Sequence, residues 1–266
     1  MKAVILARGL GTRMRKQDPT ATLSEEQKQA ADAGVKAMIS VGRPFLDHVI
    51  SEMADAGFTD ICLVIGPEHD VIKDYYDNVE KERVKISYAV QAEPLGTADA
   101  VASAEEFAGD DRVLVVNSDN FYPAAALKAL AAEPGSAAVG FDRAAMVAKS
   151  NIPEDRIAAF ALLDVGPDGV LLDVLEKPSP ELVKEKGDDA PISMNCWLMG
   201  PTIFEATRQI ELSPRGELEL TEAVRKAIEL GDQYTVVGVE EGVLDMSSQG
   251  DIEDVAEALE GHSVQL

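Results

Sequence analysis

Residues 6–15, LARGLGTRMR, contain residue types that could bind phosphate groups. Gly9 and Gly11 let the backbone adopt positive φ angles and bring its N–H groups close to a phosphate. Arg13 carries a planar fork of donors that matches phosphate oxygens. The segment lacks the Gly-Lys-Ser/Thr of a Walker loop, and Met14 stands where a dinucleotide-binding loop would place its third glycine. These residues alone indicate either a phosphate cradle or an ordinary glycine-rich turn.

Asp119 is a second candidate for chemistry, because it closes the apolar run RVLVVNSD. A carboxylate at the end of a buried strand is unfavourable unless a partner compensates its charge. A magnesium ion that bridges phosphate groups is such a partner. The alternative is that Asp119 caps the helix expected after it.

Short apolar runs that alternate with helical patterns must position these residues. The expected strands are Lys2–Ala7, Asp60–Ile65, Val84–Gln91, Arg112–Asn117 and Ser136–Phe141. The expected helices are Phe45–Ala56, Glu68–Tyr76, Thr97–Phe107 and Ala124–Ala131. Continuous apolar strands separated by helices predict a doubly wound α/β fold with a mostly parallel, Rossmann-like sheet. Ligands of such folds bind beyond the carboxyl ends of the strands.

The pattern changes after about residue 150. Residues 157–178 read as two strands joined by a Pro-Asp-Gly turn, which predicts a β-hairpin. A strand at Ile192–Met199 follows, then helices from Pro201, near Leu218–Leu230 and after Gly250. No Gly/Ser-rich linker and no repeat interrupts the chain. We therefore expect one domain over residues 1–266, whose second half packs on the same sheet as a substrate-binding lobe.

The charge balance limits the expected partners. The chain has 48 acidic and 24 basic residues, a net charge of −24. Such a surface repels nucleic acid and anionic membranes, so neither is an expected partner. An anionic substrate would need a local basic cluster, which Arg8, Arg13, Arg15 and Lys16 could form. Two cysteines inside apolar runs and the lack of a long apolar segment predict a cytoplasmic protein.

Seven segments in order make the chain resemble the sugar-1-phosphate nucleotidyltransferases. The segments are GLGTRM, VKAMISVGRPFLDHVI, QAEPLGTADAV, VVNSDN, LEKP, RGELELTEAV and VLDMSSQGDIEDV. The resemblance runs from Lys2 to about Leu259, and it implies a nucleotide-binding half (1–150) and a sugar-phosphate-binding half (151–266). It implies a magnesium-dependent enzyme in which a sugar 1-phosphate attacks the α-phosphate of a nucleoside triphosphate and releases pyrophosphate. UTP and dTTP are the favoured nucleotides, and a homo-oligomer is one expected state.

The resemblance also implies roles for individual residues. The implied catalytic residues are Arg13, Lys36 and Lys177, and the implied metal ligands are Asp119 and Asp245. The implied nucleotide-binding residues are Leu6, Ala7, Gly9, Gly11, Thr12, Gln91, Gly96 and Thr97, of which the last three correspond to the base-recognition segment. The implied sugar-phosphate-binding residues are Glu176, Lys177 and Asn195.

The sequence departs from the family pattern at several positions. Arg8 replaces a glycine or alanine, Ser118 replaces a glycine, and Trp197 replaces a small residue beside Asn195. DMSSQGD departs from the usual Asp-Ile-Gly-Thr-Pro, and residues 16–34 resemble an insertion. We expect Arg8 to add a cation near the triphosphate or the sugar phosphate, the insertion to act as a lid over the nucleotide, and the changes around Trp197 to alter the sugar pocket.

Three alternatives stay open on the sequence. One is a guanylyl- or cytidylyltransferase acting on an unusual sugar phosphate. Another is a transferase for an alcohol phosphate such as phosphocholine. The third is a non-catalytic homologue that binds a nucleotide sugar and regulates a partner.

Overall fold

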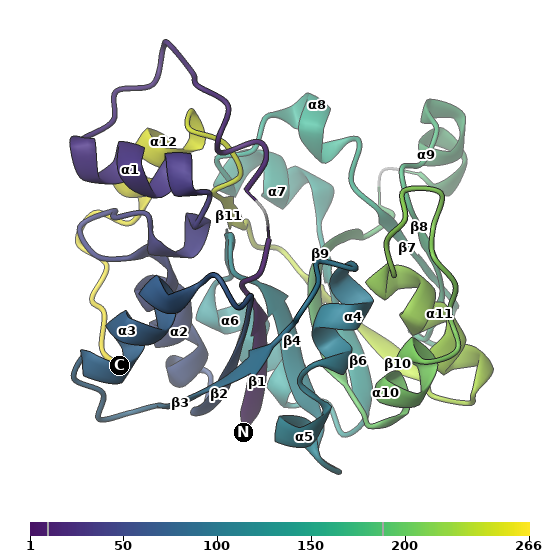
Figure 1. The fold of residues 1–266 in the computed structure, drawn as a ribbon. Coiled ribbons are helices and arrows are strands. Elements are labelled where there is room, and N and C mark those ends of the chain that lie inside the picture. The colour runs from purple at the N-terminus through teal and green to yellow at the C-terminus, as the bar shows by residue number, and fades with distance from the viewer. Residues whose placement is uncertain (10, 188) are drawn as a thin grey trace.

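The computed structural model describes residues 1–9, 11–187 and 189–266. Its centre is a nine-stranded sheet whose main path runs β10-β6-β9-β4-β1-β2-β3 (Figure 1). The pairs β1–β2, β1–β4, β2–β3 and β6–β10 are parallel, whereas β9 lies antiparallel between β4 and β6. The hairpin β7–β8 extends from β9, and β5 and β11 form a separate two-stranded ribbon.

The strands are β1 (Lys2–Leu6), β2 (Asp60–Ile65), β3 (Lys85–Val90), β4 (Val113–Asn117), β5 (Asn120–Phe121), β6 (Ser136–Phe141), β7 (Leu162–Val165), β8 (Leu171–Leu175), β9 (Ile192–Met199), β10 (Tyr234–Val239) and β11 (Leu244–Asp245). The helices are α1 (Glu25–Ala33), the short 3₁₀ helix η1 (Lys36–Met38), α2 (Phe45–Asp55), α3 (Asp70–Asn78), α4 (Thr97–Ala102), α5 (Glu105–Ala108), α6 (Ala124–Ala131), α7 (Arg143–Lys149), α8 (Glu154–Ile157), α9 (Pro180–Lys186), α10 (Thr202–Thr207), α11 (Leu220–Glu229) and α12 (Asp251–Ala258). Each of these helices is too short or too polar to cross a membrane.

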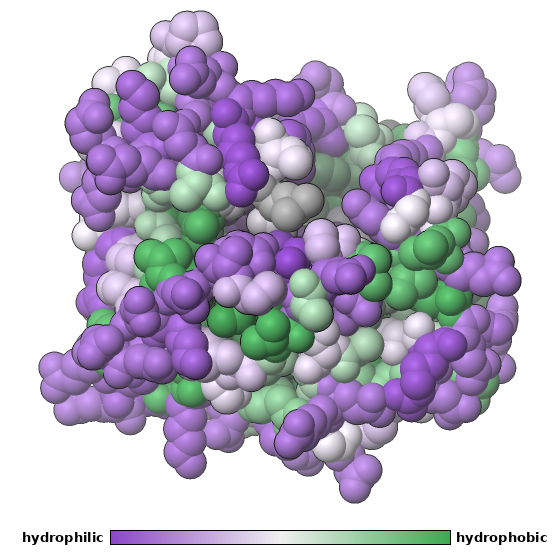
Figure 2. All heavy atoms as spheres, in the orientation of Figure 1, coloured by the Kyte–Doolittle hydropathy of each residue, from purple (hydrophilic) through white to green (hydrophobic). Residues whose placement is uncertain are grey.

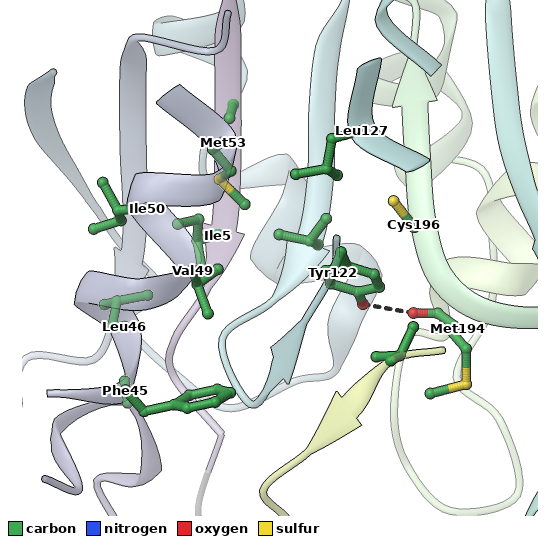
Figure 3. Close-up of a cluster of buried hydrophobic side chains, with 14 of the residues drawn as sticks. Ile5, Phe45, Leu46, Val49, Ile50, Met53, Tyr122, Leu127, Met194 and Cys196 are labelled. Carbon is green, nitrogen blue, oxygen red and sulfur yellow. Dashed lines mark hydrogen bonds between the residues drawn. The ribbon is translucent and has the colours of Figure 1, made fainter. Parts of the chain in front are cut away.

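Helices cover both faces of the sheet, which explains why β1 is apolar at successive positions. Ala3 and Ile5 face a core that includes residues of α2, α3, α6 and α12. Val4 and Leu6 face a second core formed with α4, α10 and α11. Figure 3 shows the first core, with Phe45 to Met53 of α2 packed beside Ile5. Hydrophilic side chains cover most of the outer face in Figure 2, as the acidic composition requires.

The predicted fold class and the five strands of the first half are confirmed, and every boundary of these strands agrees to within one residue. The expected helix Thr97–Phe107 is wrong as one element, because it is divided into α4 and α5. The sequence analysis also missed β10, whose side chains are mostly half-buried at the edge of the sheet. Its sequence, YTVVGV, nevertheless carries β-branched and aromatic residues that favour a strand.

Residues 16–34, the segment interpreted as an insertion, contact Gln249, which lies two residues before α12. The side chain of Gln249 accepts from the backbone N–H of Asp18 and donates to the carbonyl of Met14, both at 3.1 Å. The segment contains α1, whose first turn is closed by a capping box of Ser24 and Gln27. α1 ends at Gly34, with φ of 76°. The role of this segment as a lid stays a prediction.

The buried side chain of His48 predicts a pH-dependent stability. His48 on α2 is 3% exposed, and its Nδ1 lies 2.9 Å from Nδ1 of His262. Burial, and then the charge of His262, lower the pKa of His48. The unfolded chain therefore takes up a proton near pH 6.5 that the folded chain resists, so stability falls as the pH drops below that value.

Between pH 7.5 and 5.5, we expect His48→Gln to reduce the loss in the free energy of unfolding by up to about 1 kcal/mol. Urea unfolding at several pH values measures it. Burial also lowers the pKa of His69, so His69→Gln in the same experiment separates the two contributions. Equal pH slopes for His48→Gln and the unmodified protein would contradict the assignment to His48.

Candidate functional site

Side chains that could bind ligands or take part in a reaction gather at the carboxyl edge of the sheet. β1, β4, β2 and β3 end there at Leu6, Asn117, Ile65 and Val90. The residues just beyond these ends border a cavity of about 380 Å³. Its lining comprises Leu6, Ala7, Arg8, Gly9, Thr12, Lys36, Ala37, Gln91, Pro94, Gly96, Thr97, Ala100, Asn117, Ser118, Asp119 and Glu217. Eight of the residues expected to bind nucleotide or act in catalysis therefore lie around one cavity, together with the expected metal ligand Asp119.

Lys36 and Asp119 form an ion pair in this cavity. Nζ of Lys36 donates to Oδ2 of Asp119 at 2.7 Å, and the two side chains are 14% and 22% exposed. Lys36 begins the 3₁₀ helix η1, whereas Asp119 follows β4 by two residues. Partial burial strengthens the attraction between the two charges compared with a surface pair. The lysine is consequently not the solvated surface residue that its sequence context alone favours.

The β5–β11 ribbon brings Asp245 next to Asp119. Asp245 pairs with Asn120 across the ribbon, and the backbone N–H of Met246 donates to the carbonyl of Asp119 at 2.8 Å. Asn120 also donates through its side chain to Oδ1 of Asp245 at 2.9 Å. Two carboxylates more than a hundred positions apart in sequence thus become neighbours.

Buried Asp245 is surrounded by compensating groups. Its Oδ2 accepts from Ser247 Oγ at 2.7 Å and from a guanidinium nitrogen of Arg156, which also contacts Asp251. Burial, and then the negative charge of Asp119, raise the pKa of Asp245. A cation near both carboxylates would relieve this repulsion.

The donor set fits a hard divalent cation. Asp119 and Asp245 supply carboxylate oxygens, and the described residues contain no cluster of three or more His, Cys, Asp or Glu side chains that could enclose a metal. Magnesium commonly uses one or two carboxylates and takes its other ligands from water and phosphate groups. Lys36 and Arg156 are the cations that neutralise the two carboxylates in this structure.

Gln91 is fixed in the wall of the same cavity. Its side-chain Nε2 donates to the carbonyl of Gly96 at 3.0 Å and to Oδ2 of Asp99 at 2.8 Å. Two acceptors at the nitrogen orient the amide, so the oxygen is the end left for other partners. Its backbone carbonyl accepts from Nε of Arg8 at 2.8 Å. Arg8 therefore lies against Gln91 and is only 7% exposed.

Gly96 is required by the close approach of a second segment. Its φ is 116°, and a Cβ on this residue would lie 2.5 Å from the carbonyl oxygen of Leu218. Thr97, the next residue, accepts from the backbone N–H of Leu220 at 2.9 Å. These contacts hold Leu218 and Leu220 against the cavity-lining residues Gly96 and Thr97. Gly9 differs, because a Cβ there would meet no protein atom within 4 Å.

We expect Gly96→Ala to destabilise the fold by about 2 kcal/mol or more, since both the backbone angle and the contact with Leu218 oppose a side chain. Gly9→Ala is the matched control, with a loss below about 0.5 kcal/mol. The added methyl of Gly9→Ala would instead occupy cavity space and weaken ligand binding. Thermal unfolding of both variants checks this. A Gly96→Ala protein as stable as Gly9→Ala would contradict the packing described.

A second cavity of about 180 Å³ adjoins the first. Its lining is Thr97, Asn117, Glu176, Asn195, Arg215, Glu219, Leu220 and Thr221. Thr97 and Asn117 border both cavities, so the two spaces are adjacent. Asn195 has a φ of 53° within β9. The Tyr122 hydroxyl donates to the carbonyl of Met194 at 2.6 Å, and this bond fixes the strand beside Asn195 (Figure 3).

Several expected residues lie outside both cavities. Arg13 and Lys177 are exposed and line neither cavity, and Lys177 has a φ of 45°. Gly11 is buried, with the backbone of Gly34 against it. Trp197, expected to alter the sugar pocket, lines neither cavity. It is fully buried, and its ring packs edge-on against that of Tyr234, with 6.0 Å between the ring centroids.

Sequence reasoning missed four charged residues of the site. Arg215, Glu217 and Glu219 line the cavities, and Arg156 neutralises Asp245. The available signal for the first three was the segment RGELELTEAV, which carries part of the family resemblance but to which no site residue was assigned. Nothing in the local sequence pointed to Arg156, because its partner lies 89 positions away.

Comparisons with known proteins agree with one another. A family model described as "Nucleotidyl transferase" matches residues 2–260. The UTP–glucose-1-phosphate uridylyltransferase AglF of Haloferax volcanii is 27% identical over 266 residues and matches 100% of this chain and 99% of that protein. A glucose-1-phosphate thymidylyltransferase of Streptomyces griseus is 30% identical over 236 residues, 87% of this chain.

The relatives differ in length. The chain spans 58% of the Streptomyces protein and between 49% and 61% of several other curated relatives. Among solved structures, a UDP-glucose pyrophosphorylase in complex with UDP-glucose has a TM-score of 0.74, over 98% of this chain and 99% of that chain, at 17% identity. At that identity the likeness establishes a shared fold.

Proposed function

Because the chain belongs to the nucleotidyl transferase family, we propose that it transfers a nucleotidyl group from a nucleoside triphosphate to a sugar 1-phosphate and releases pyrophosphate. The observation that carries the proposal is the pair of adjoining cavities at one edge of the sheet. The larger is bordered by the glycine loop and the Lys36–Asp119 pair, and the smaller by Glu176 and Asn195. We assign the first to the nucleotide and the second to the sugar phosphate, within a single domain whose halves meet near residue 150.

The transfer requires positioning and charge neutralisation more than covalent help from the protein. Gly9 leaves open space where its backbone borders the larger cavity, so a phosphate can approach closely. Lys36 would donate to the triphosphate as negative charge builds on the leaving pyrophosphate. Arg13, exposed in the glycine-containing segment of residues 6–15, would supply a second cation to the same oxygens.

Asp119 and Asp245 would hold a divalent cation, with Mg²⁺ the expected one. Such a cation neutralises phosphate charge and makes the α-phosphate more open to attack. For the carboxylates to bind this cation, Lys36 must move from Asp119 to the phosphates, and Arg156 must share Asp245 with the cation. Both arrangements keep every buried charge paired.

Glu176 and Asn195 would bind hydroxyl groups of the sugar, since a carboxylate accepts and an amide both accepts and donates. Lys177 would neutralise the sugar phosphate. We favour UTP or dTTP as the nucleotide, in keeping with the names of the two curated relatives described above.

Pyrophosphate release with Mg²⁺, measured across ATP, CTP, GTP, UTP and dTTP and a panel of sugar 1-phosphates, tests the proposal. Release that requires one nucleotide and one sugar phosphate together supports it and identifies both. Release with phosphocholine alone would select an alcohol-phosphate transferase. Binding of nucleotide sugars without any release would select a regulatory homologue.

A further inference from the structure

Arg8 follows β1 directly and is anchored in the wall of the larger cavity. Its Nε donates to the carbonyl of Gln91 at 2.8 Å, and its Nη2 contacts the carbonyl of Ala92 and Oε2 of Glu68, both at 3.3 Å. The side chain is 7% exposed. An arginine held at three points has little freedom to swing toward another part of the site.

The remaining nitrogen of this guanidinium is unpaired. Nη1 of Arg8 is buried and has no hydrogen-bond partner among the described residues. The free-energy cost of burying a donor without an acceptor is larger than the net stabilisation by an average hydrogen bond. Such groups are therefore rare in native proteins, and each calls for an explanation. Because Arg8 borders the cavity, an acceptor on a bound ligand would provide it.

The surroundings of Arg8 indicate a neutral acceptor. Glu68 already offsets the charge of the guanidinium, whereas Lys36 pairs with the metal-binding candidate Asp119 at another part of the cavity wall. The backbone carbonyl of Gln91 accepts from Arg8, and the side-chain nitrogen of Gln91 donates to Gly96 and Asp99. The wall near Arg8 therefore offers a fixed N–H donor, from Arg8, beside a fixed oxygen acceptor, from Gln91.

We propose that Arg8 is a base-specificity residue, whose Nη1 donates to a ring carbonyl of the nucleotide base while Oε1 of Gln91 accepts from the ring N–H beside that carbonyl. The proposal rests on the proposed function, since it requires a nucleotide in the larger cavity. It replaces the expectation that Arg8 contacts the triphosphate or the sugar phosphate. Uracil, thymine and guanine carry a carbonyl next to a ring N–H; adenine and cytosine do not. UTP, dTTP or GTP should consequently bind in preference to ATP and CTP.

Isothermal titration calorimetry of the full chain tests this with UTP, dTTP, GTP, ATP, CTP and inorganic tripolyphosphate, which has no base. Arg8→Ala should raise the Kd of the preferred nucleotide at least about tenfold and change the Kd of tripolyphosphate by no more than about twofold. Arg8→Lys retains the charge without the planar fork and should likewise lose base preference. If Arg8→Ala fails to fold, Arg8→Lys carries the test.

Arg112→Ala is the matched control, because Arg112 also donates to backbone carbonyls, Glu133 and Gly135, but precedes β4 at the other edge of the sheet. It should not change nucleotide affinity. Equal weakening of tripolyphosphate in Arg8→Ala, unchanged base preference in both Arg8 variants, or a preference of the unmodified protein for ATP or CTP would each overturn the proposal. Absence of any nucleotide binding by the unmodified protein would instead reject the proposed function itself, and this inference with it.

Discussion

Replacing Asp119 with asparagine is expected to reduce kcat/KM for nucleotidyl transfer by at least about a hundredfold. Asparagine retains the size of the side chain but removes the negative charge needed to bind a divalent cation at phosphate groups. It also frees Lys36 from its ion pair. Initial rates of pyrophosphate release at saturating Mg²⁺ measure the effect.

The control for this prediction is Asp110→Asn, which removes a carboxylate from an exposed loop before β4. It should have unchanged activity. Thermal unfolding should give nearly equal midpoints for both variants, because Asp119 remains 22% exposed and its loss creates no cavity. An Asp119→Asn enzyme that keeps more than about a tenth of the original kcat/KM would contradict a role for this carboxylate in metal-assisted transfer.

Lys36→Met should produce the second-largest loss, also about a hundredfold in kcat/KM. Methionine preserves the apolar stem of lysine while it removes the ammonium that we assign to the triphosphate. Lys28→Met, on the exposed side of α1, is the matched control and should have no effect.

The double variant Lys36→Met/Asp119→Asn separates a joint role from two independent ones. The two side chains are 2.7 Å apart and would act on the same phosphates, so their losses should not multiply. We expect the double variant to be little worse than the poorer single variant. Losses that multiply fully would indicate that the two residues act independently and that their contact is incidental.

Local sequence predicted the elements better than it predicted how they meet. Apolar runs such as ICLVI placed β2 correctly, because a strand buried on both faces needs no polar alternation. β10 was missed although its run YTVVGV carries the β-branched and aromatic residues that are typical of strands. The neighbourhood of Asp119 and Asp245 depends on the β5–β11 pairing, between strands of two residues each, and no local pattern specifies such a contact.

The candidate site shows the same limit. The family resemblance led to Lys36, Gln91 and Gly96, and all three border the larger cavity. The expected contribution of Arg13 and Lys177 remains a prediction, because both side chains are exposed. The position of Arg8 could not be derived from the sequence, since burial against Gln91, Ala92 and Glu68 arises only when β1 and the segment after β3 lie at the same sheet edge.

Phosphorus-31 NMR of the reaction mixture tests the central claim most directly. The protein would be incubated with Mg²⁺, one nucleoside triphosphate and one sugar 1-phosphate selected by the pyrophosphate-release panel. The account predicts that the triphosphate and sugar-phosphate signals decline together, while free pyrophosphate and the paired doublets of a nucleotide-sugar diphosphate appear in equal amounts. Pyrophosphate that appears together with nucleoside monophosphate, with the sugar 1-phosphate unconsumed, would contradict it, because that outcome is hydrolysis and not transfer.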